Sequence, residues 1–143
     1  MVRSPFHFID TPPILADSTP GVDVALVRIS ALNASDVSLS LQHYSEHPVP
    51  PALRSRILAL CRKDAATSLE EVCDLNFELG EVFASAVLES GVKTEDVDLI
   101  ASHGQTLWHH PVSCGSGGYA NGQRRAATLQ MGESAVIAQR TGV

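Results

Sequence analysis

A strand-forming run that ends in a glycine-bearing polar turn constrains the fold of this chain more than any other feature. The run Val97–Ile100 favours a strand, and four hydrogen-bonding side chains follow between Ser102 and Thr106. Open α/β sheets bind their ligands at such strand ends. Imidazole, carboxamide and hydroxyl groups suit a polyhydroxylated ligand better than an apolar one. The pattern therefore predicts an α/β fold with a ligand-binding turn, although these side chains could simply satisfy backbone groups at a strand end.

Alternation of apolar and polar residues predicts a hairpin near the start of the chain. Val22–Ile29 and Val37–Tyr44 alternate in the manner of strands, and a turn at 33–36 joins them. A helix is expected from Ala52 to Arg62, after a proline suited to a first helical turn. Later segments predict strands at Asp96–Ser102 and Ala127–Gln130, then a helix from Glu133 to Arg140.

A longer helix is expected between these parts. Thr67 and Ser68 both have capping-box spacing to a glutamate, and Gly91 can end the helix in a left-handed conformation. One broad face of this helix should be buried. That face comprises Leu69, Val72, Cys73, Leu79, Val82, Phe83, Ala86 and Val87.

Composition excludes several classes of protein. With 143 residues, 44% of them hydrophobic, the chain can bury one core, so one domain is expected. A net charge of -6 with only 10 basic residues argues against nucleic-acid binding. No apolar run approaches the ~20 residues of a membrane span, and the N-terminal apolar stretch is too short for a signal peptide. Three widely spaced cysteines favour a reducing compartment, so we expect a cytoplasmic protein.

Four motifs resemble one known family. Ser102–Pro111 reads Ser-His-Gly-Gln-Thr-x-x-His-x-Pro, and Thr128–Gly132 and Ala138–Gly142 follow in the same order as in anhydro-N-acetylmuramic acid kinases. Asp74–Val87 is similar to the helix that precedes the first of these motifs. The resemblance runs from about Gly21 to the end of the chain and corresponds to the N-terminal half of the family.

The resemblance implies a fold and a division of the chain. The fold would be α/β, with a ribonuclease-H-like mixed sheet and flanking helices, as in the N-terminal part of the actin and sugar-kinase fold, and incomplete here. Residues 21–143 would form a single domain. Residues 1–20 would be a poorly defined segment, because the prolines near Thr11–Ile14 are poor material for a central strand. Against the family pattern, Gly115–Gly122 looks like an inserted surface loop.

The resemblance also implies an ATP-dependent reaction with Mg²⁺ that opens the ring of 1,6-anhydro-N-acetylmuramic acid and phosphorylates the sugar. The sugar contacts would come from His103, Gly104, Gln105 and Thr106. The expected catalytic base lies beyond Val143, so this chain alone is expected to be inactive. The alternative is a non-catalytic binding or interaction domain that keeps the kinase-like fold. Expected partners are the amino sugar and either a second copy or a chain that carries the missing second domain.

The resemblance assigns nucleotide binding to the turn before the first predicted strand. Its candidate residues are Ser18, Thr19, Gly21 and Asp23. Asp17 places a carboxylate where phosphate oxygens would lie, and Pro20 lacks an N–H donor, so the turn is degenerate. It could equally be an ordinary turn.

A zinc site is the remaining alternative. Four competent ligands, His103, His109, His110 and Cys114, lie within twelve residues. Their spacing lacks the paired pattern of structural zinc sites, so no metal site is predicted.

Overall fold

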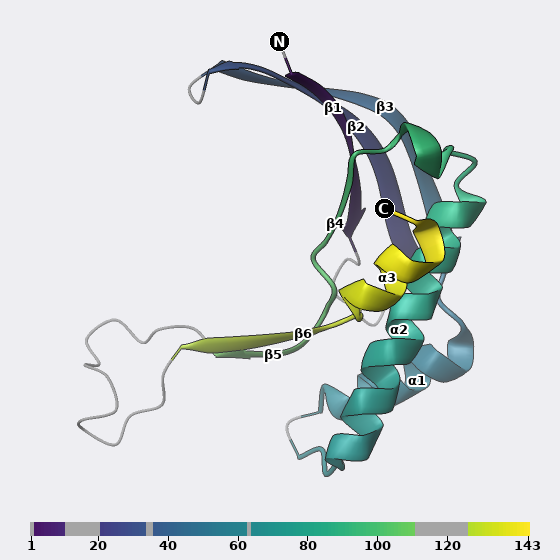
Figure 1. Cartoon of the computed structure of the whole chain (residues 1–143). Coiled ribbons are helices and arrows are strands. Elements are labelled where there is room, and N and C mark those ends of the chain that lie inside the picture. The colour runs from purple at the N-terminus through teal and green to yellow at the C-terminus, as the bar shows by residue number, and fades with distance from the viewer. Residues whose placement is uncertain (1, 11–20, 34–35, 63, 111–125) are drawn as a thin grey trace.

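Two sheets and three α-helices make up the described part of the chain (Figure 1). The computed structural model describes residues 2–10, 21–33, 36–62, 64–110 and 126–143. The elements in chain order are β1 (Val2–Asp10), β2 (Gly21–Asn33), β3 (Asp36–Pro48), α1 (Pro51–Leu60), α2 (Leu69–Glu89), the 3₁₀ helix η1 (Thr94–Asp96), β4 (Leu99–Ser102), β5 (Gln105–His110), β6 (Ala127–Met131) and α3 (Ser134–Thr141).

The larger sheet is mixed and has the strand order β3-β2-β1-β4. β2 pairs antiparallel with both β1 and β3, whereas β1 and β4 run parallel. The three helices gather on one side of this sheet, and the hairpin β5–β6 extends away from them (Figure 1). The arrangement confirms the predicted mixed α/β class and is consistent with a sugar-kinase-like N-terminal domain. The ribonuclease-H-like assignment stays a prediction.

β1 occupies the middle of the sheet, within the segment that the sequence suggested was poorly defined. The prolines near Thr11–Ile14 argued against a central strand in this segment, and Pro5 itself lacks the N–H that such a strand needs. In the structure Pro5 pairs with Arg28 of β2 but lies just outside Phe6–Ile9, the part of β1 that pairs with β4. The prolines near Thr11–Ile14 lie outside the described residues. The division of the chain into residues 1–20 and 21–143 stays a prediction.

The predicted hairpin is confirmed as β2 and β3, and both strands are longer than the alternation indicated. The expected strand from Asp96 begins only at Leu99, because residues 94–96 form η1. The polar segment after β4 contains a strand that was not predicted, β5, which pairs with β6. The expected insertion at Gly115–Gly122 lies outside the described residues.

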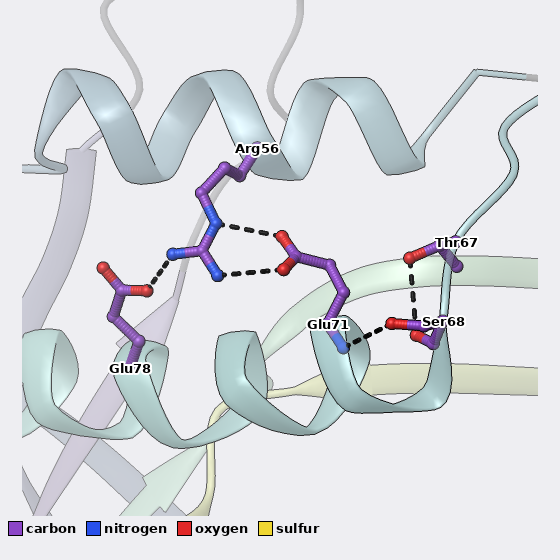
Figure 2. Close-up of polar contacts among 5 residues, drawn as sticks. All are labelled: Arg56, Thr67, Ser68, Glu71 and Glu78. Atoms are coloured by element: carbon purple, nitrogen blue, oxygen red, sulfur yellow. Dashed lines mark hydrogen bonds and ion pairs between the residues drawn. The ribbon is translucent and has the colours of Figure 1, made fainter.

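Local hydrogen bonds explain where α2 begins and how α1 is attached to it. The Ser68 hydroxyl accepts a hydrogen bond from the Glu71 N–H at 3.0 Å, so Ser68 rather than Thr67 is the N-cap of α2. Arg56 of α1 donates from Nε to Glu71 at 2.9 Å and also contacts Glu78 (Figure 2). Gly91, with φ of +82°, follows the end of α2 as expected.

The core lies between the helices and the sheet. Its largest fully buried side chains are Phe83, Leu53, Ile57, Leu75, Leu79, Met131, Val22, Val24 and Val87. The prediction of the buried face was wrong for two residues. Leu69 is 89% exposed, and Cys73 is also exposed. Both lie in the first turns of α2. An amphipathic pattern gives the orientation of a helix but not how much of its length its neighbours cover.

Candidate functional site

The turn between β4 and β5 holds its shape through its own polar groups. Ser102 Oγ accepts a hydrogen bond from the Gly104 N–H at 3.1 Å, and His103 Nδ1 donates to the Gly104 carbonyl oxygen at 3.0 Å. Because a carbonyl can only accept, the neutral ring carries its proton on Nδ1 and keeps Nε2 as an acceptor. The imidazole is therefore oriented, with one nitrogen left for a ligand.

Gly104 allows this turn to approach the end of β6. Its φ is +71°, a conformation that favours glycine, and a Cβ atom here would lie 2.6 Å from the backbone oxygen of Met131. The turn and the end of β6 thus meet backbone to backbone. A larger residue would push them apart.

Gln105 and Thr106 lie on β5, where they pair with Met131 and Gln130 of β6. Gln105 is only 5% exposed, and its Nε2 donates to the carbonyl oxygen of Thr106 at 3.2 Å. Trp108 is 54% exposed farther along the same strand. These residues support the turn from the hairpin side.

A pocket of about 530 Å³ lies where the turn meets the end of β4, the end of β6 and the start of α3. His103 and Gly104 line it, whereas Gln105 and Thr106 are not among its lining residues. The sequence did not predict Gln130 and Ser134, which add an amide and a hydroxyl to the same pocket. The apolar part of the lining includes Leu99, Ile100, Met131 and Ile137. The pocket thus combines apolar surface with hydrogen-bonding groups of several kinds.

The predicted nucleotide residues are only partly described. Ser18 and Thr19 lie outside the described residues. Asp23 pairs with Glu46 across β2 and β3, and the Tyr44 hydroxyl lies 2.9 Å from a carboxylate oxygen of each, so its single proton can be donated to either. These hydrogen bonds, first to Glu46 and then to Asp23, raise the pKa of Tyr44 well above its ordinary 10.0.

Neither Gly21 nor Asp23, the two described nucleotide-binding candidates, resembles part of a phosphate-binding turn. Gly21 begins β2 opposite Pro48, and a Cβ there would lie 3.1 Å from the His47 backbone oxygen. Asp23 and Glu46 present two carboxylates, which repel the oxygens of a triphosphate. Two of the four predicted nucleotide residues are thus described, and neither supplies a positively charged side chain for phosphate.

The described part of the chain shows neither a metal-binding cluster nor a membrane-spanning helix. Among those residues, no group of three or more His, Cys, Asp or Glu side chains is placed to hold a metal ion. Of the candidate zinc ligands, His103 and His109 are exposed, and Cys114 lies outside the described ranges. No helix within the described residues is long and apolar enough to cross a membrane.

Comparison with known proteins identifies the family. A family model described as anhydro-N-acetylmuramic acid kinase matches residues 15–143. The chain belongs to the anhydro-N-acetylmuramic acid kinase family. Residues 102–106, at the turn and the start of β5, and the α2 segment therefore lie inside the matched region, together with the pocket.

Individual relatives agree with this assignment. The chain is 38% identical over 130 residues to an anhydro-N-acetylmuramic acid kinase from Caldanaerobacter subterraneus subsp. tengcongensis. It is 40% identical over 129 residues to proteins of the same name from Bacillus cereus (strain AH820) and Bacillus anthracis (strain CDC 684 / NRRL 3495). These matches cover 87–88% of this chain but 31% of each relative. The chain therefore spans about a third of the length of these kinases.

Proposed function

We propose that this chain provides a sugar-binding wall of an anhydro-N-acetylmuramic acid kinase and that 1,6-anhydro-N-acetylmuramic acid is the ligand of the pocket beside the Ser102–Gly104 turn. The observation that carries the proposal is the pocket itself. Its volume of about 530 Å³ suits a small molecule, and its lining mixes apolar surface with hydroxyl, imidazole and amide groups. A cyclic amino sugar offers the complementary set of hydroxyl groups, an amide and apolar ring faces.

Each lining residue has a distinct part in this proposal. His103 Nε2 accepts a hydrogen bond from a sugar hydroxyl, because Nδ1 is held by the Gly104 carbonyl. Ser134 and Gln130 can both donate and accept, so they suit hydroxyl and amide groups. We assign Gln105 and Thr106 to holding the turn from β5 rather than to direct contact, since neither lines the pocket.

In the complete kinase, ATP with Mg²⁺ would supply the phosphoryl group. The described residues near the expected nucleotide turn present the carboxylates of Asp23 and Glu46 instead of phosphate donors. No phosphoryl-transfer step is therefore assigned to this chain. The same observation favours the second candidate function, a domain that binds the sugar without transferring phosphate.

A chemical-shift titration of the chain with 1,6-anhydro-N-acetylmuramic acid tests the proposal. We expect shifts at the turn, at Gln130 and at the start of α3, with a dissociation constant no better than about millimolar, on the order of -4 kcal/mol. His103→Ala should weaken binding about tenfold through the lost hydrogen bond, about 1.4 kcal/mol. His109→Ala is the matched control, because His109 is also exposed but does not line the pocket.

The outcomes separate the two candidates. Saturable binding that depends on His103, together with ADP release from ATP in a coupled assay, supports the kinase. Binding without ADP release supports the sugar-binding domain. Equal effects of the two histidine substitutions, or no shifts in the pocket, would reject the sugar site.

A further inference from the structure

The side chain of Asn76 on α2 holds the turn that joins β6 to α3, although the two segments are 56 residues apart in the chain. The Gly132 N–H donates to Asn76 Oδ1 at 2.8 Å, and Asn76 Nδ2 donates to Glu133 Oε2 at 3.0 Å. The Glu133 N–H adds a third bond, to the backbone oxygen of Asn76 at 3.0 Å. The Asn76 carboxamide therefore accepts a hydrogen bond from Gly132 and donates one to Glu133, which are consecutive residues.

Two glycines allow the segments to come this close. A Cβ atom at Gly80 would lie 2.9 Å from the Glu133 backbone oxygen and 3.1 Å from Val136 Cβ. A Cβ atom at Gly132 would lie 2.3 Å from Cε2 of Phe83, which is fully buried. The turn is thus pressed against α2 at Gly80 and Phe83, in the two helical turns that follow Asn76. A shift of the turn away from α2 would lengthen these hydrogen bonds, whose usual range is about 2.7–3.2 Å.

The held turn is also a wall of the pocket. Gly132 and the first α3 residues, Ser134 and Ala135, line the cavity. Glu133 caps α3, because its Oε1 accepts a hydrogen bond from the Ala135 N–H at 3.2 Å while its Oε2 accepts from Asn76. One carboxylate therefore connects α2 to the start of the helix that carries Ser134.

We infer that Asn76 is a positioning residue for the sugar pocket: through Gly132 and Glu133 it sets where Ser134 and the start of α3 lie relative to the Ser102–Gly104 turn. This inference rests on the proposed function of that pocket. Asn76 does not line the cavity, so its effect on the ligand is indirect. A polar group can bind selectively only when its neighbours hold it to within a fraction of an ångström.

The hydrogen bond between the Asn76 amide and the Glu133 carboxylate can be tested by exchanging its donor and acceptor. Asn76→Asp keeps the acceptor for the Gly132 N–H but sets a second carboxylate against Glu133. Two adjacent carboxylates repel unless they share a proton, which raises the pKa of one of them. The double variant N76D/E133Q reverses donor and acceptor, so the glutamine amide donates to the new carboxylate and its oxygen still accepts from the Ala135 N–H.

We expect N76D to weaken binding of 1,6-anhydro-N-acetylmuramic acid about tenfold near pH 7.5, and to recover affinity as the pH falls and the pair takes up a proton. N76D/E133Q should restore affinity at neutral pH to within about threefold. Gln42→Glu is the matched control, because it makes the same change of charge on an exposed β3 side chain outside the pocket. If N76D does not fold, Glu133→Ala removes the partner of Asn76 Nδ2 and should weaken binding about threefold.

Hydrogen exchange of the Gly132 and Glu133 amides, followed by NMR in the ligand-free chain, separates this inference from the sugar assignment. Slow exchange in the parent chain and in N76D/E133Q, with faster exchange in N76D, supports the positioning role. Absence of sugar binding by the parent chain would overturn the proposed function, and exchange would then still decide the role of Asn76 at the turn. Three results would overturn the inference. They are equal exchange of these amides in all three proteins, binding of the sugar by N76D as tightly as by the parent, and a double variant that folds but does not recover sugar affinity.

Discussion

Gly132→Ala should destabilise the fold more than an ordinary glycine substitution. Gly132 has φ of +120°, and an added Cβ would lie 2.3 Å from Phe83 Cε2 and 2.9 Å from Phe83 Cδ2. A positive φ costs a residue with a side chain roughly 1–2 kcal/mol. Overpacking against the ring of Phe83, which is fully buried, adds about 1–3 kcal/mol. The expected loss in the free energy of unfolding is therefore roughly 2–5 kcal/mol.

Urea denaturation followed by circular dichroism measures this loss, and Gly91→Ala is the matched control. Gly91 has φ of +82° but no atom within 4 Å of the added Cβ, so this variant carries only the backbone cost of roughly 1–2 kcal/mol. Phe83→Leu in the Gly132→Ala background should recover part of the loss by making room. A Gly132→Ala variant no less stable than Gly91→Ala, or no coupling with Phe83→Leu, would refute the argument that the turn is pressed against α2.

Four further predictions concern other parts of the molecule. Ser68→Ala should lower the free energy of unfolding by about 1 kcal/mol in urea denaturation, because the α2 cap loses its acceptor. The Arg56 hydrogen bond lowers the pKa of Glu71 from its ordinary 4.5, so this contribution to stability is present above that pH and lost as the pH falls; thermal melts of the parent chain and Glu71→Gln should converge in acid. Tyr44 should ionise above its ordinary 10.0, so the phenolate absorbance that Tyr44→Phe removes should appear only at higher pH; a normal titration would contradict the hydrogen bonds to the two carboxylates. Leu39 is 69% exposed on β3, and Leu39→Ser should reduce any self-association seen by sedimentation velocity.

Some parts of the molecule follow from a few neighbouring residues. The start of α2 was predictable because the Ser68 hydroxyl and the Glu71 N–H are three positions apart. The hairpin of β2 and β3 was predictable because alternation and a short turn suffice to specify it. The turn at His103 and Gly104 follows a strand and contains a glycine, so its position could also be read from the chain.

The rest depended on contacts between distant segments. β1 lies in the sheet centre because it pairs with both β2 and β4, and no pattern within Val2–Asp10 records those partners. Both Leu129 and Ile137 are large apolar residues near the end of the chain, yet Leu129 is 47% exposed whereas Ile137 is 3% exposed within the core. How deeply a side chain is buried depends on its neighbours in space.

The candidate site also combines a part that follows from neighbouring residues with a part that depends on contacts between distant segments. The sequence by itself determined the polar turn, because strand propensity, a glycine and polar side chains act over a few residues. Only the tertiary structure placed Gln130 and Ser134 beside that turn and brought Asn76 against Gly132. Those residues come together through packing of α2 on α3 and pairing of β5 with β6. Close packing between segments more than fifty residues apart depends on the shape of both surfaces, which no local pattern in the chain contains.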